Sequence, residues 1–186
     1  IPMILVNGSV GIGTGWSTDI PCFNPIDLVD NIKRLMNNEN IKPMDPYYRG
    51  FKGSIEKIND VSWNSIGNFK IVDKTVHVTE LPIGMWTEVF KKHLNKLIEK
   101  EEIKSFSANG DTNEINFIIK LEQTLSEQDA IELLKLENKI NATNLVAFDE
   151  NQQIVKYGSV DDILWTFYTY RLNFYEKRRL FLIKTL

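Results

Sequence analysis

The stretch from Ile1 to Pro21 constrains this chain most, because glycines alternate with other residues through its middle. An apolar run over Ile4 to Val6 predicts a short strand, which ends at Asn7-Gly8, a pair that readily adopts positive φ. The later glycines stand at alternate positions, namely Gly11, Gly13 and Gly15. We therefore expect a slim loop that can approach another molecule closely, with the bulky side chain of Ile12 directed outward.

Two other interpretations of this loop have to be weighed. It could be a structural turn inside a sheet, with Ile12 folded back onto the core. It could also cradle a phosphate, but the G-x-G-x-x-G and G-K-[ST] patterns are absent, and Trp16 to Ile20 predicts extended chain where a phosphate loop would open a helix. The sequence leaves the structural turn open and does not support nucleotide binding.

Composition and length describe an ordinary globular chain. Its 186 residues are 42% apolar and 25% charged, which suits one domain or a domain and a half with a real core. The chain begins at Ile1, without an initiator Met or a signal peptide, and we expect it to be a piece of a longer soluble protein. No apolar run approaches the roughly 20 residues of a membrane span, so we expect no membrane partner.

Cysteine and histidine are too few for a disulfide or a structural zinc site. Cys22 is the single cysteine, and we expect it to be inert. His77 and His93 are the two histidines, and no serine or cysteine partner for nucleophilic catalysis is evident. We therefore predict no catalytic residue, no metal ligand and no cofactor site in this chain.

The formal net charge of -3 argues, by itself, against nucleic-acid binding, but the charges are unevenly placed. Asp19 is the one charged residue among the first 24, acidic residues gather over 122–137, and basic residues dominate 171–184. Lys92, Lys96 and Lys100 also recur at helical spacing. Such a lysine stripe is either a solvated surface or an edge that follows phosphates without sequence preference.

The pattern of apolar residues and breakers predicts an alternation of helices and strands. Helices are expected over 26–36 after the cap Asn24-Pro25, over 86–101, and from Ser126 to about 134. Residues 40–48 are expected to be a connector, and the stretch 138–143 is polar and helix-poor and leads into the next expected strand. Expected strands are 53–58, 61–66, 69–72 and 76–81, forming an antiparallel meander, then 103–108 and 114–121 joined by a turn at Asn109-Gly110-Asp111, and a hairpin of 145–148 with 154–157.

A last helix, capped at Ser159, continues without a breaker to the chain end and could form one arm of a coiled coil. The fold class predicted from these patterns is α+β, with a mixed, largely antiparallel sheet, flanking helices and a long C-terminal amphipathic helix.

Five strings along the chain carry a family resemblance. The first is Pro2-Met3-Ile4-Leu5-Val6-Asn7-Gly8, followed by Gly11-Ile12-Gly13-Thr14-Gly15-Trp16-Ser17 and Ile20-Pro21. The later strings are Phe51-Lys52-Gly53-Ser54-Ile55-Glu56, Glu80-Leu81-Pro82 with Trp86-Thr87, Asn144-Leu145-Val146-Ala147-Phe148-Asp149, and Arg171-Leu172 with Tyr175 and Arg178. Together they resemble the eukaryotic-type type IIA DNA topoisomerases (topoisomerase II), in the region downstream of the catalytic tyrosine.

The resemblance implies a place within the cleavage core of such an enzyme. Residues 1–24 would be the edge of the winged-helix region with a DNA-wedge loop, 25–158 a tower domain, and 159–186 the start of a coiled coil. The parent enzyme would be a magnesium-dependent homodimer that cuts one duplex, passes another through the break using ATP, and reseals the first. It would act in the nucleus or, for a viral source, in the cytoplasm or nucleus. The nucleophilic tyrosine would lie upstream of Ile1, so the isolated fragment would be inactive.

The same resemblance implies site residues for a double-stranded DNA partner. The isoleucine that matches Ile12 wedges between base pairs and bends the duplex, and Gly11 and Gly13 flank it. Trp86 matches another DNA-contacting position, although its pattern also suits the first core residue of its helix. The last DNA-contacting segment comprises Lys135, Leu136, Glu137, Asn138, Lys139, Ile140, Asn141, Ala142, Thr143 and Asn144. An alternative of a different class remains, a non-catalytic protein-interaction module with a structural glycine-rich loop.

Overall fold

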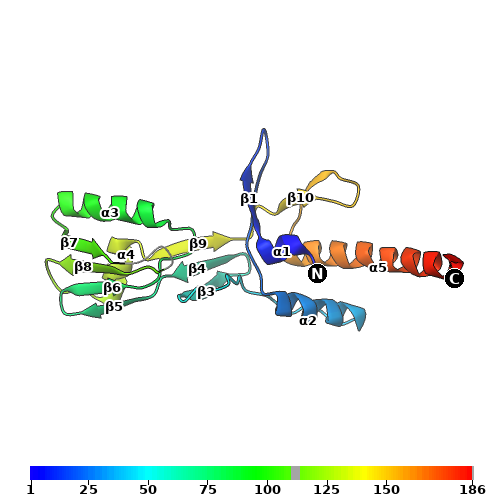
Figure 1. Ribbon diagram of the computed structural model, residues 1–186, viewed down its shortest axis with the longest axis horizontal. Helices are drawn as coiled ribbons and strands as arrows, with labels where there is room; N and C mark the ends of the chain where they lie inside the picture. The colour runs from blue at the N-terminus through cyan, green and yellow to red at the C-terminus, as the bar shows by residue number, and fades with distance from the viewer. Residues whose placement is uncertain (110–113, 186) are drawn as a thin grey trace. The chain divides into compact units, whose positions relative to one another are not determined.

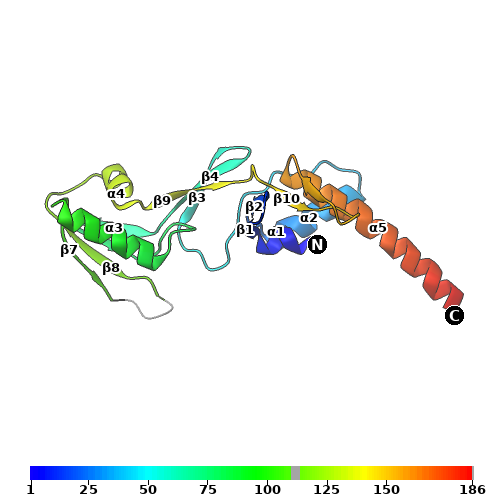
Figure 2. The same cartoon turned by 90° about the horizontal axis from the view of Figure 1, so that it is seen from above.

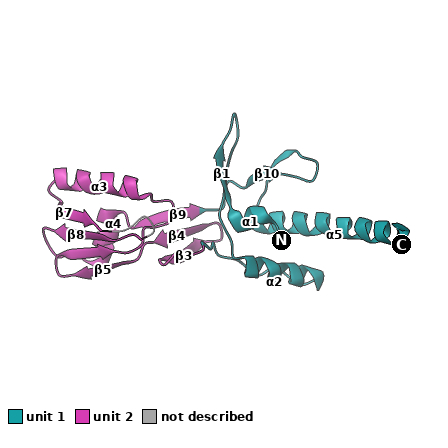
Figure 3. Cartoon of the chain, viewed as in Figure 1, with its two compact units in different colours: residues 1–48, 141–186 teal, residues 49–140 magenta. Residues whose placement is uncertain are grey.

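The computed structural model describes residues 1–109 and 114–185, so the expected turn at Asn109-Gly110-Asp111 lies partly outside the described residues. The chain divides into two compact units (Figure 3). Unit 1 comprises residues 1–48 and 141–186, and unit 2 comprises residues 49–140. Residues 25–48 and 141–158 of the expected tower segment therefore lie in the same unit as the glycine-rich stretch.

As far as the chain is described, unit 1 contains two small hairpins and three helices (Figure 1). Its helices are α1 (Met3–Asn7), α2 (Pro25–Met36) and α5 (Val160–Thr185). The antiparallel hairpins are β1 (Ser9–Ile12) with β2 (Ser17–Ile20), and β10 (Val146–Phe148) with β11 (Ile154–Lys156). Unit 1 also has fully or almost fully buried apolar side chains, among them Leu5, Ile20, Phe23, Leu28, Leu145 and Leu164.

The described residues of unit 2 form two sheets and two helices. One sheet has the order β3-β4-β9, and the other has the order β5-β6-β8-β7. The strands are β3 (Ser54–Asn59), β4 (Ser62–Ile66), β5 (Phe69–Val72), β6 (Thr75–Val78), β7 (Ile103–Ala108), β8 (Phe117–Leu121) and β9 (Glu137–Asn141), whose last residue belongs to unit 1. The helices are α3 (Thr87–Glu99) and α4 (Glu127–Leu134).

The core of unit 2 lies between the four-stranded sheet and its two helices (Figures 1 and 2). Phe90 of α3 meets Phe117 of β8 edge to face, with ring centroids 5.0 Å apart. Leu134 of α4 belongs to the same buried cluster. This arrangement, with the antiparallel pairings of both units and the long α5, confirms the predicted α+β class.

Local capping signals place the helices α2, α4 and α5 where the sequence predicts them. The Asn24 side chain accepts a hydrogen bond from the Ile26 amide, and Pro25 opens α2. The Ser126 hydroxyl accepts from the Asp129 amide at the start of α4, and Ser159 accepts from Asp162 near the start of α5. Each cap satisfies an amide that the first helical turn leaves without a partner.

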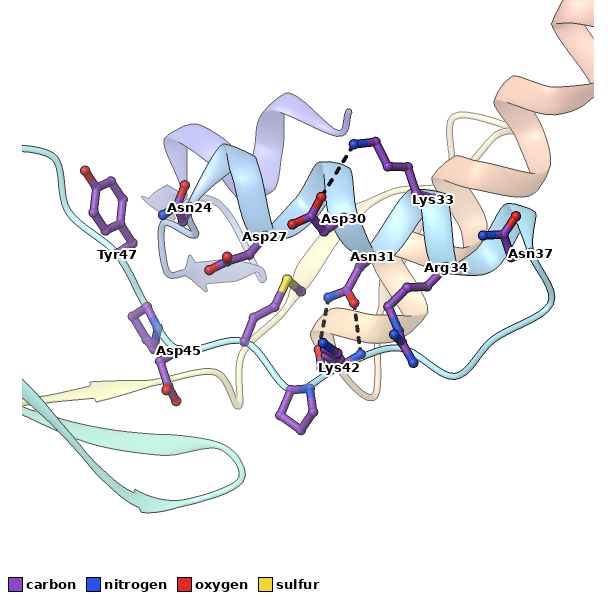
Figure 4. A pocket seen from close by; sticks show the side chains of 13 residues that line it. Asn24, Asp27, Asp30, Asn31, Lys33, Arg34, Asn37, Lys42, Asp45 and Tyr47 are labelled. Atoms are coloured by element: carbon purple, nitrogen blue, oxygen red, sulfur yellow. Dashed lines mark hydrogen bonds and ion pairs between the residues drawn. The ribbon is translucent and has the colours of Figure 1, made fainter.

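The connector after α2 is held by a buried amide side chain (Figure 4). Asn31 donates from Nδ2 to the Lys42 carbonyl and accepts from the Lys42 amide at Oδ1, both at 2.9 Å. A polar hollow of about 640 Å³ lies beside this connector. Arg34 at its edge is already paired with the Asn40 carbonyl and Glu39, so we read the hollow as a satisfied surface rather than a binding site.

The structure departs from the sequence analysis at three places. Ile4 to Val6 lies in α1, because three apolar residues are too few for their spacing to separate a strand from a helix. Residues 138–141 belong to β9, whose backbone runs beside β4. The four-strand meander is split at Gly67-Asn68 between the two sheets, since β8 and β9, distant in sequence, supply the missing neighbours.

The terminal helix α5 carries few buried residues, Ile163 and Leu164, both near its start. Four successive apolar residues, Leu180 to Ile183, are exposed toward its end. No helix in the described parts of the chain is both long and apolar enough to cross a membrane.

Candidate nucleic-acid interface

The glycine-rich stretch folds into the β1–β2 hairpin, which projects from unit 1 (Figure 1). Its register pairs Ile12 with Ser17, and the Gly13 amide closes the tip by donating to the Trp16 carbonyl at 2.7 Å. Gly15 turns the chain with φ of +80°, a conformation that glycine adopts without steric cost. The predicted extended chain after the tip is confirmed, although the loop itself is largely a pair of strands.

The side chain of Ile12 stands in solvent at the end of this hairpin. It is 95% exposed, so the interpretation in which Ile12 folds back onto the core is wrong. Its neighbour Gly11 has open space where a side chain would stand. An isolated aliphatic group on a narrow, uncharged tip can enter a narrow apolar or stacked environment with little desolvation cost.

Val10 is a second exposed aliphatic residue that sequence reasoning missed. It is 83% exposed and lies two positions from Ile12, so the pleat of β1 places both on one face. The signal was the alternation of Val10 and Ile12 around Gly11. The glycines hide that signal, because they favour a loop over a strand.

A groove of about 400 Å³ lies between the two hairpins of unit 1. Its lining includes Trp16 on one side and Phe148 on the other. Phe148 is 69% exposed at the end of β10, another residue that the sequence did not single out. The groove adds apolar surface beside the hairpin that carries Ile12.

Trp86 lies in unit 2, immediately before α3, and is 76% exposed. The interpretation of Trp86 as the first core residue of its helix is therefore wrong. The preceding loop is fixed to β9, because Asn138 donates from Nδ2 to the Ile83 carbonyl at 2.7 Å. The buried Ser65 hydroxyl joins the same elements by accepting from the Ile83 amide and donating to the Asn138 carbonyl.

The structure divides the segment 135–144 into exposed and buried positions. Leu136, Ile140 and Ala142 are buried, so their side chains cannot meet a duplex without unfolding. Exposed side chains of the segment are Lys135, Glu137, Asn138, Lys139 and Thr143. Asn141 and Asn144 are partly buried. The Asn144 side chain donates from Nδ2 to the Ser17 hydroxyl at 2.9 Å.

Two titratable groups near the base of the hairpin, Tyr48 and Cys22, have raised pKa values and are not poised to ionise at neutral pH. Burial, with smaller effects of Cys22 and Asp19, raises the pKa of Tyr48 to about 12. Burial also raises the pKa of the Cys22 thiol, which donates to the Asn7 carbonyl. Both groups stay neutral near pH 7, and a protonated thiol is a poor nucleophile.

Among the described residues, the histidines and carboxylates form no metal-binding cluster. His93 donates from Nε2 to the Leu133 carbonyl at 2.9 Å, an interaction that ties α3 to α4. Among residues 1–109 and 114–185, no three His, Cys, Asp or Glu side chains gather where they could hold a metal ion. The described side chains therefore do not fit a magnesium site.

Comparisons with known proteins give the family. The model of the family described as the DNA gyrase/topoisomerase IV A subunit matches residues 1–186. The mitochondrial DNA topoisomerase 2 of Dictyostelium discoideum is 45% identical over the whole chain, which covers 15% of that protein. DNA topoisomerase 2 of Saccharomyces cerevisiae is 43% identical over 96% of the chain and 13% of the relative. The chain thus spans only a small part of these relatives.

A solved structure agrees with the sequence comparisons. The crystal structure of the Plasmodium falciparum topoisomerase II DNA-binding, cleavage and re-ligation domain matches with a TM-score of 0.92 at 40% identity. The match covers all of this chain and 26% of that one. The chain therefore belongs to the family of the DNA gyrase/topoisomerase IV A subunit, which confirms its resemblance to the type IIA DNA topoisomerases.

Proposed function

We propose that this chain is a DNA-binding and DNA-bending part of the gate of a type II DNA topoisomerase. The observation that carries the proposal is the position of Ile12, 95% exposed at the tip of a slim hairpin. Inserting an apolar side chain unstacks a base step at a cost of roughly a few kcal/mol, and the resulting bend lets more protein meet the backbone. Gly11 and Gly13 keep the hairpin narrow enough to enter a groove.

Further contacts would come from surface residues of unit 2 and from the segment 135–144. Trp86 offers an exposed indole, and Lys135 and Lys139 offer two cations that could neutralise phosphates. We propose that the tower assignment applies to unit 2, with residues 1–24 at the winged-helix edge and α5 opening a coiled coil. The division of the chain into two units supports a separate tower, and the relatives' names, DNA topoisomerase 2, support a place for the chain in such an enzyme.

We further propose that the complete protein is an ATP-hydrolysing, magnesium-dependent homodimer that acts in the nucleus or in virus-infected cells. Its nucleophilic tyrosine would precede Ile1. The described residues do not fit a metal site, so this chain would bind and shape the duplex while other segments cleave it.

Fluorescence anisotropy of a labelled duplex, titrated with the 186-residue chain at several salt concentrations, tests the proposal. A DNA-binding surface releases counterions, so the logarithm of the association constant should fall linearly with the logarithm of salt concentration. A protein-interaction module whose lysines are merely solvated would give no saturable change in anisotropy. That second outcome would reject DNA binding by this chain.

A further inference from the structure

The β1–β2 hairpin has little of its own to hold it in one direction. Each strand has four residues, and of these eight only Ile20, at the base, is buried. A two-stranded hairpin in water is marginally stable at best. The direction in which Ile12 points must therefore be fixed by contacts between β2 and the rest of unit 1.

Three hydrogen bonds supply those contacts, all to residues 144–146. The Thr18 hydroxyl donates to the Val146 carbonyl at 2.7 Å, and the Asp19 amide donates to the Asn144 carbonyl at 2.9 Å. The Asn144 side chain donates to the Ser17 hydroxyl, also at 2.9 Å. Leu145, between the two partners, is completely buried and anchors them in the core of unit 1.

We propose that Thr18 and Asn144 form a clamp that aims Ile12, and that they are positioning residues for DNA bending. This inference rests on the proposed function and adds to it the residues that hold the Ile12 side chain in place during bending. The stacked bases resist separation, and this resistance acts on Ile12 when it enters a base step. A hairpin free to swing would move aside, and the base step would remain closed.

The pleat separates Thr18 from Ile12, whereas Ser17, the partner of Asn144, is paired with Ile12. Thr18 is paired with Gly11, one position from Ile12, so Thr18 and Ile12 lie on opposite faces of the hairpin. Thr18 is partly buried, whereas Ile12 is exposed. Thr18 thus acts through the orientation of Ile12 and not by touching the duplex.

The clamp is tested with Thr18→Val, which keeps the shape of the side chain and removes the donor, and Thr18→Ser, which restores the donor. Asn144→Ala is a second disruption. Thr79→Val is the matched control, because it removes a hydroxyl-to-carbonyl bond of the same kind, to Asn68, in unit 2. Hydrogen exchange is measured on the 186-residue chain, and bending is measured by FRET on an end-labelled duplex with the complete enzyme.

We expect Thr18→Val and Asn144→Ala to speed amide exchange over residues 9–20 by about two- to tenfold, the range for one lost hydrogen bond, and to lower the bent fraction by a similar factor. Thr18→Ser should recover both, and Thr79→Val should change neither. A mismatch at the base step that is opened should suppress the bending defect, since that step unstacks more easily.

Unchanged exchange over residues 9–20 in both disrupted variants overturns the clamp, as does a bending defect that Thr18→Ser fails to rescue. If Ile12→Ala lowers bending and the clamp variants do not, the clamp alone is wrong. If Ile12→Ala also leaves bending unchanged, the proposed function fails and the clamp inference fails with it.

Discussion

At the scale of single residues, Gly8 joins α1 to β1 in a conformation that other residues rarely adopt. Its φ is +66° with ψ of 178°, and a β-carbon there would lie 2.7 Å from the Ile20 carbonyl oxygen. Gly8→Ala should therefore lower the free energy of unfolding by about 1–3 kcal/mol, measured by urea denaturation. Gly11→Ala is the control, because open space surrounds that position, and its effect should stay within about 0.5 kcal/mol. Equal effects of the two substitutions would contradict this account.

Ile12 gives a second prediction at the residue scale, which separates function from stability. Because the side chain is exposed, Ile12→Ala should leave the urea midpoint unchanged while it lowers the bent fraction of a duplex roughly tenfold in a FRET assay with the complete enzyme. ATP hydrolysis without DNA should not change. Ile58→Ala, at an exposed isoleucine on β3, is the matched control. Unchanged bending in Ile12→Ala would reject the wedge.

At the scale of elements, the longer helices could be predicted, but the short helix α1 and part of the strand pairing could not, for a physical reason. Helix starts depend on neighbours within a turn, so Asn24 and Ser126 are visible as caps in the sequence itself. The strand β9 depends on β4, about 70 residues away, and its polar residues give no local sign of that partner. The glycines beside Ile12 favour an outward side chain but leave a fold-back onto the core open. The burial of Leu136 and the exposure of Trp86 depend on tertiary packing.

The strand that follows α4 carries a prediction about salt dependence. Lys135 and Lys139 are exposed around the start of β9. Each phosphate that a protein neutralises contributes about −0.9 to the slope of the logarithm of the association constant against the logarithm of salt concentration. Replacing both lysines by Gln should reduce the steepness of that slope by as much as about 1.8 in the anisotropy titration. Lys70→Gln, at an exposed lysine on β5 outside the proposed contacts, should leave it unchanged. An unaltered slope in the double variant would remove these lysines from the interface.

At the scale of the whole molecule, unit 2 is a continuous stretch placed between the two segments of unit 1. Its main hydrophobic cluster runs from Val76 to Leu136, so all of the cluster's members lie within residues 49–140. Unit 1, in contrast, must bring together two segments that are separated by the whole of unit 2. A chain organised in this way can form the core of the inserted unit from contacts that the insertion itself contains.

We therefore expect residues 49–140, expressed alone, to fold and to unfold cooperatively in urea, with the buried Trp63 as the fluorescent reporter. Phe90→Ala should lower the stability of this fragment by about 3–5 kcal/mol, because it removes a ring from the centre of the cluster. Val89→Ala, at the exposed neighbour on the same helix, should change it by less than about 0.5 kcal/mol. A broad, non-cooperative transition, or equal effects of the two substitutions, would mean that unit 2 needs the rest of the chain to hold its core.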